Sequence, residues 1–245
     1  MHGYFLLLLT CWLRTPPPHQ VVPYPDNSLD TEQYRSLGIP ATDAPWTASD
    51  YQIAFQILDQ LYAEDKTALP RADSPYSGML FARMTDLDNF RVANNPGRQL
   101  IRLEHARALI ERLRLYYVEP THAHERFGRE TLRLLVLDFR IQSEIRRTIQ
   151  TLRPQYPAEN HPRAPQTRPQ PNTKVLQTLL QTLEQDAQRY DETAMSDFLN
   201  QLYFVFPEYL DAVQREEVHQ RLIFVEARFP YADGRPLIAE LRGVL

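Results

Sequence analysis

The chain has 245 residues, 43% of them hydrophobic, which is enough apolar material for one large core or two small ones and argues against wholesale disorder. It contains only 7 glycines but 20 prolines, and scarce glycine argues against a hairpin-rich β protein because few positions tolerate a positive φ. The formal net charge of −4 argues against nucleic-acid binding, and the single cysteine excludes an internal disulfide and any multi-cysteine metal site.

Residues 1–11 have the character of a secretory leader. The apolar run over residues 5–13, FLLLLTCWL, is too short to span a membrane, since it would rise only about 14 Å as a helix against a hydrocarbon layer of about 30 Å. The tetrad Leu8-Leu9-Thr10-Cys11 resembles a bacterial lipobox, in which a signal peptidase cuts before a cysteine that then carries a lipid. Thr10 departs from that pattern, where Gly, Ala or Ser is usual, and no basic residue precedes the leucines.

The resemblance implies that Cys11 is lipidated and that the protein is held at the membrane by an anchor instead of a spanning helix. Residues 12–46 contain seven prolines and few periodic apolar positions, so we expect a disordered, proline-rich tether there. The alternative is an uncleaved apolar N-terminus that packs on the folded body.

Helical periodicity begins at residue 47 and predicts an N-terminal helical block over residues 47–152. Thr47 or Ser49 is expected to cap a helix that ends near Lys66, and further helices are expected near 76–91 and over 98–118. A helix over about 122–152 has apolar residues nearly all round between positions 132 and 141. Such a helix is buried on more than one side, so we expect it to be the central one.

Residues 153–172 contain six prolines and are predicted to be a linker. A C-terminal block over 173–245 follows, with helices expected from 173 to about 190, over 193–206 with Pro207 ending the second, from 208 to about 228, and after Pro236. The predicted fold is therefore all-α, an irregular bundle of about seven or eight helices in two docked blocks behind a disordered tether.

Charge is distributed unevenly along the chain. Residues 98–153 carry 12 basic and 7 acidic side chains, whereas residues 1–97 carry 6 and 11 and residues 174–245 carry 7 and 12. A basic segment between two acidic ones indicates that the segments attract one another across internal contacts. We therefore expect the two blocks to dock.

Familiar catalytic motifs are missing from the sequence, which has no glycine-rich phosphate loop, no Gly-x-Ser-x-Gly elbow and no His-Glu-x-x-His pair. No catalytic residue is assigned and no cofactor is expected. The weak metal candidates are His122 and His124, but residues two apart on a helix point about 200° away from each other and cannot share one ion.

Four aromatic residues gather at the end of one predicted helix and form the candidate partner surface. All four fall within a span of seven residues, so they cannot all lie on one stripe of a helix, and some of them are expected to be exposed. Packing of the same residues into the core is the alternative. The four residues are Tyr203, Phe204, Phe206 and Tyr209.

Together these observations predict a non-enzymatic, lipid-anchored protein on the periplasmic side of a bacterial envelope, where it binds other envelope proteins and no nucleic acid. One alternative is an intracellular, cytoplasmic interaction or regulatory protein whose apolar N-terminus is incidental. Another is a hydrolase with a histidine-based site assembled from distant residues such as His122, His124 and Glu130.

Overall fold

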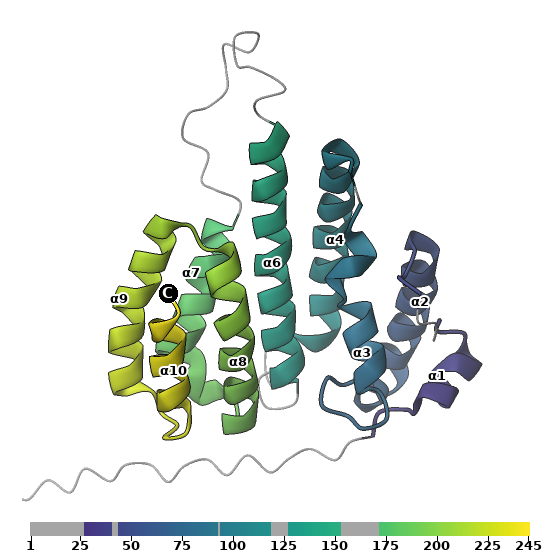
Figure 1. The fold of residues 1–245 in the computed structure, drawn as a ribbon. Coiled ribbons are helices and arrows are strands. Elements are labelled where there is room, and N and C mark those ends of the chain that lie inside the picture. Colours follow the sequence, from purple (N-terminus) through teal and green to yellow (C-terminus); the bar gives the residue numbers. More distant parts are fainter. Residues whose placement is uncertain (1–26, 41–43, 93, 119–126, 153–171) are drawn as a thin grey trace, which may run out of the picture.

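The computed structural model describes residues 27–40, 44–92, 94–118, 127–152 and 172–245, and these residues form helices and connecting segments without any strand. Figure 1 shows a row of helices in which α6 stands between two groups. The prediction of an all-α bundle in two docked blocks is confirmed. Within the described residues the α-helices are α1 (Thr31–Leu37), α2 (Ala48–Glu64), α3 (Gly78–Met84), α4 (Pro96–Tyr117), α6 (Gly128–Leu152), α7 (Thr173–Gln181), α8 (Glu192–Tyr209), α9 (Ala212–Arg228) and α10 (Gly234–Gly243).

Short irregular helices connect several of these elements. The helix expected near 76–91 is split into α3 and a 3₁₀ turn over Leu87–Phe90. The helix expected from 173 to about 190 loses its α geometry after α7, continuing as a π turn over Thr182–Asp186 and a 3₁₀ turn over Ala187–Arg189. Another 3₁₀ turn, Lys66–Ala68, follows α2.

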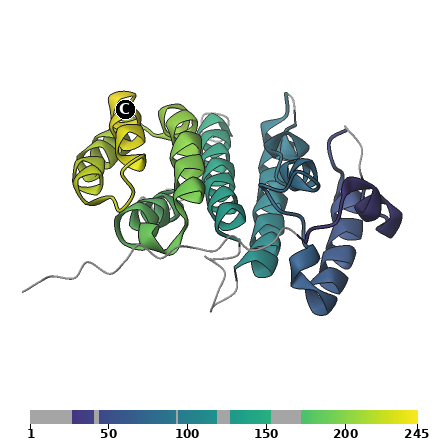
Figure 2. The same cartoon turned by 90° about the horizontal axis from the view of Figure 1, so that it is seen from below.

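Helix α6 is the element on which both blocks pack, as Figure 2 shows from below. At 100° per residue, its apolar side chains fall on two nearly opposite faces. One face is buried in the core formed with α1–α4, and the other in the core formed with α7–α10. The prediction of a central helix buried on more than one side is therefore confirmed. The first face consists of Leu134, Leu137, Ile141 and Ile145, and the second of Leu132, Leu135, Val136 and Phe139.

The predicted tether is wrong in its extent, because residues 27–40 and 44–46 pack on the body. Helix α1 begins with a capping box in which Asp30 accepts from the Gln33 backbone and the Gln33 side chain accepts from the Asp30 backbone. Tyr34, Ile39 and Trp46 are each no more than 2% exposed. Their spacing follows no helical or strand period, so periodicity did not reveal their burial. Residues 1–26 lie outside the described residues.

The prediction that Pro207 ends its helix is also wrong, since α8 continues to Tyr209. Proline has no backbone N–H and leaves one carbonyl of the preceding turn without a partner. In the last turn this loss is small, and the Leu210 N–H still reaches the Phe206 carbonyl at 3.0 Å. The Arg215 guanidinium donates to the carbonyls of Pro207 and Leu210, so the helix end is satisfied by a side chain from α9.

Ion pairs join the basic central segment to the acidic segments on both sides, as the charge pattern predicts. Most of these side chains are partly exposed, so each pair contributes at most about 1 kcal/mol, and the pairs orient the helices more than they stabilise them. The pairs are Arg112–Asp59 (2.9 Å) and Arg129–Asp73 (3.9 Å) towards the N-terminal side, and Arg133–Asp197 (2.9 Å), Arg147–Glu208 (3.6 Å) and Arg146–Asp211 towards the C-terminal side.

A buried polar network fixes the register of α6 against α7 and α9. The Asn172 amide donates to Ser143 Oγ at 3.1 Å, and the Gln214 amide donates to Asn172 Oδ1 at 3.4 Å. Arg146 in turn donates to Gln214 Oε1 at 2.9 Å. A shift of any of these helices would leave buried polar groups unsatisfied, which opposes sliding of the C-terminal block along α6. Except for Asn172, the predicted linker lies outside the described residues.

Removing residues 153–245 is expected to leave a fragment that aggregates, because it strips the cover from the second apolar face of α6. Size-exclusion chromatography with light scattering measures the association, and circular dichroism measures the melting. The same fragment carrying Leu132→Gln and Phe139→Gln should be more soluble, since its bare face is less apolar. A truncated fragment that is monomeric and melts cooperatively would contradict the shared-helix architecture.

Candidate functional site

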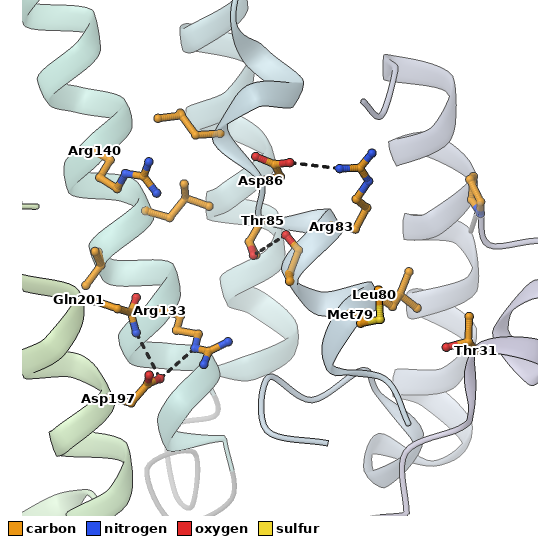
Figure 3. A pocket seen from close by; sticks show the side chains of 15 residues that line it. Thr31, Met79, Leu80, Arg83, Thr85, Asp86, Arg133, Arg140, Asp197 and Gln201 are labelled. Atoms are coloured by element: carbon orange, nitrogen blue, oxygen red, sulfur yellow. Dashed lines mark hydrogen bonds and ion pairs between the residues drawn. The ribbon is translucent and has the colours of Figure 1, made fainter. Parts of the chain in front are cut away.

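A pocket of about 760 Å³ lies where the two blocks meet over α6. Figure 3 shows its lining, with α6 and α8 on one side and α3 and the segment after it on the other. The pocket follows from the pattern on α6, because the stripe containing positions 133, 136, 137 and 140 lies between the two apolar faces. Its lining residues are Thr31, Pro40, Met79, Leu80, Ala82, Arg83, Thr85, Asp86, Leu87, Arg133, Val136, Leu137, Arg140, Asp197 and Gln201.

Two ion pairs stand on the two sides of this pocket. Arg83 on α3 pairs with Asp86 at 3.2 Å, a contact between residues three apart where the helix ends. Arg133 on α6 pairs through Nε with Asp197 on α8 at 2.9 Å, and the Gln201 amide donates to the same carboxylate oxygen at 3.2 Å. These pairs leave each aspartate in the lining with an arginine partner.

A third arginine of the lining, Arg140 on α6, makes no hydrogen bond or ion pair with any residue that the structure describes. Its side chain is half-buried, and its Nε atom is buried without a partner. Figure 3 shows the guanidinium projecting from α6 into the pocket. Since Arg83 and Arg133 are matched by Asp86 and Asp197, the charge of Arg140 is the uncompensated one in this lining.

Two helices that border the pocket, α3 and α8, each carry one large exposed apolar side chain. Met79 on α3 lines the pocket and is 84% exposed. Phe204 on α8 is 74% exposed and shares a helical face with Asp197 and Gln201, from which it is seven and three residues away. Helices α6 and α8 run side by side in the same direction, and the ion pairs Arg133–Asp197 and Arg147–Glu208 join them.

The four aromatic residues predicted as a partner surface differ in burial in the structure. Phe206 is fully buried against Phe139 with ring centroids 5.9 Å apart, and Tyr209 is buried and donates its hydroxyl to Glu144 at 2.9 Å. Tyr203 is half-buried against the C-terminal core. Phe206 and Tyr209 are therefore core residues, which corrects their assignment to a partner surface, and Phe204 is the exposed member.

Glu130, the one described residue of the histidine-based alternative, is sealed in the core at 1% exposure and does not line the pocket. Its Oε1 atom accepts the backbone N–H of Ala72 at 2.5 Å, while Oε2 is buried without a partner. Burial raises the pKa of this carboxyl to about 7. The group thus holds the loop before α3 in place. His122, His124 and Cys11 lie outside the described residues.

That loop also depends on other side chains for its hydrogen bonds. The Tyr117 hydroxyl donates to the Pro70 carbonyl at 2.8 Å, and the Arg71 N–H donates to Ser77 Oγ at 3.0 Å. Together with Glu130 these contacts satisfy backbone groups that a buried irregular segment cannot pair with itself. The loop in turn positions α3, which carries one side of the pocket.

No protein-family model matches the chain, and no curated protein or solved structure matches it either. The described helices include none that is both long and apolar enough to cross a membrane. Among the same residues, no three His, Cys, Asp or Glu side chains gather in a way that would hold a metal ion.

Sequence reasoning did not identify the pocket arginines as a site. A signal was present on α6, because Arg133 and Arg140 are seven residues apart and share one stripe of the predicted central helix. The partners Asp86 and Asp197 come from distant segments, so their pairing could not be read from spacing.

Glu130→Gln is expected to flatten the pH dependence of stability. The folded protein keeps a proton on Glu130 between pH 4.5 and about 7 that the unfolded chain releases, so stability should fall as pH rises through this range. The wild type should lose about 3 kcal/mol more stability over this range than the variant does. Urea unfolding at pH 5 to 8 measures the difference.

Asp138, whose pKa burial also raises, is present in both proteins and therefore cancels in this comparison. Parallel curves of unfolding free energy against pH for the wild type and the Glu130→Gln variant would show that Glu130 is ionised in the folded protein throughout the range.

Proposed function

We propose that this protein is a non-enzymatic binding module that receives a segment of a partner protein in the pocket between its two helical blocks. The observation that carries the proposal is the pocket itself, whose volume of about 760 Å³ lies within the range of roughly 300–1,000 Å³ usual for binding sites. Its floor of buried leucine and valine is framed by charged groups, as binding sites commonly are.

The exposed apolar side chains on the helices that border the pocket support a protein partner. Methionine and phenylalanine are enriched at protein interfaces, and Met79 and Phe204 each expose more than 70% of their surface. Polar groups stand on both sides of the apolar floor, including Thr85 and Asp86 on one side and Asp197 and Gln201 on the other. A peptide carries amides that can replace the water lost from such groups, whereas an alkyl chain cannot.

The location of this module in the bacterial envelope is part of the proposal and rests on the tetrad that ends at Cys11. Residues 12–26 separate that cysteine from the first described residue, and a stretch of this length cannot span more than about 55 Å, at up to ~3.6 Å per residue. A body on so short a connection would present its pocket to proteins near the membrane surface.

Peptide selection tests the binding function. Linear dodecapeptides selected from a phage-displayed random library against the purified protein should bind in the pocket. Ala82→Trp, which fills the pocket from α3, is then expected to weaken their binding at least about tenfold. Ala63→Trp is the matched control, because Ala63 is an exposed helical alanine outside the lining and the same change there should leave affinity unaltered.

Fluorescence polarisation with labelled peptides measures both affinities. A library that yields no specific binder, or binders that respond equally to Ala82→Trp and Ala63→Trp, would refute a peptide-binding pocket.

Metabolic labelling with a radioactive fatty acid tests the anchor. In a bacterial host we expect the full chain to take up label and to sediment with membranes, and Cys11→Ala to abolish both, because the thiol is the acylation site of a lipobox. Thr10→Ala restores the usual residue before the cysteine and should label at least as strongly as the wild type. Equal labelling of the wild type and Cys11→Ala, or none in either, would disprove the anchor.

A further inference from the structure

Arg140 has the position and chemistry of a recognition residue. Of the three arginines that line the pocket, Arg140 alone has no partner among the described residues. Arg83 pairs with Asp86, and Arg133 pairs with Asp197. The Arg140 guanidinium projects into the pocket from the helix that both cores hold in place (Figure 3). A half-buried cation without a partner is costly to maintain, and an anion placed beside it removes that cost.

We infer that Arg140 binds a side-chain carboxylate of the partner, so that the segment received by the pocket contains a glutamate or aspartate flanked by apolar residues. This inference rests on the proposed function and names the chemistry of the occupant. A guanidinium binds a carboxylate through charge-assisted hydrogen bonds, which are stronger than neutral ones.

The surroundings of Arg140 indicate the apolar residues beside the acid. Val136 and Leu137 lie about one turn before Arg140 on α6 and belong to the pocket floor. Phe204, with 74% of its surface exposed, lies on the same face of α8 as Asp197 and Gln201, which line the pocket. A segment that places its carboxylate on Arg140 therefore brings its neighbouring side chains against these apolar groups.

A carboxylate fits the charge of the lining better than a phosphate does. One uncompensated guanidinium matches a single negative charge, whereas a phosphorylated side chain carries about −1.5 to −2 near neutral pH. The second cation that a phosphate would need is already held, because Arg133 is engaged by Asp197 and Arg83 by Asp86.

Burial of Nε also prepares Arg140 for binding. The atom lies out of contact with water, so the inner part of the guanidinium is held by packing. A side chain already restricted in the free protein loses less conformational entropy when its ligand arrives.

A double-mutant cycle on the selected dodecapeptides tests the inference. We expect them to be enriched in Glu or Asp, and Arg140→Gln should weaken their binding about tenfold or more. Peptides in which the acid is replaced by its amide should bind the wild type correspondingly more weakly and should no longer respond to Arg140→Gln. Arg102→Gln on α4 makes the same charge change at an exposed arginine outside the lining and should alter affinity less than twofold.

The possible failures are distinguishable. Peptides that lose binding on Ala82→Trp but respond equally to Arg140→Gln and Arg102→Gln would overturn the role of Arg140 and leave the binding pocket standing. Tighter binding of a peptide with phosphoserine in place of the acid would assign the site to phosphate. If dodecanoate displaces the labelled peptides at a lower concentration than unlabelled peptide does, and Arg140→Gln abolishes that displacement, the site is assigned to a lipid carboxylate. If no peptide is selected, both the function and the inference are wrong.

Discussion

Burial of α6 on two nearly opposite faces is the interaction on which the rest of the structure depends. Each fully buried leucine, valine or phenylalanine contributes about 1.5–3 kcal/mol. Four such side chains on either face therefore contribute as much as the whole net stability of a typical domain. Neither block has a complete core without this helix, so the two blocks form one folding unit although each surrounds its own apolar cluster.

The pocket is a geometric consequence of that arrangement. Where two blocks pack on opposite sides of one helix, the stripes between the two packed faces meet the seam between the blocks. On one of these stripes the chain places Arg133 and Arg140, and the seam brings α3 and α8 towards them. Arg133 is used to hold α8 through Asp197, whereas Arg140 is left with its charge directed into the seam.

Buried polar groups fix the positions of the helices relative to one another along their axes. The Ser143–Asn172–Gln214 network ties α7 and α9 to one position along α6, and Glu130 ties the loop before α3 to the start of the same helix. Apolar faces tolerate small shifts, but a buried amide or carboxyl that loses its partner is costly. The polar contacts therefore set the shape of the pocket, while the apolar contacts supply most of the free energy that holds the blocks together.

The sequence by itself determined the helical class, the central place of α6, the attraction between segments of opposite charge, and an N-cap of α2 at Thr47 or Ser49, of which the structure has Thr47. Helical period, capping and charge are local properties of the chain. Only the tertiary structure decided that Trp46 is buried, that α8 passes Pro207, that Phe204 is exposed while Phe206 is not, and that Arg140 has no partner among the described residues. Each of these outcomes depends on which distant residues surround a side chain, and spacing along the chain carries no record of those neighbours.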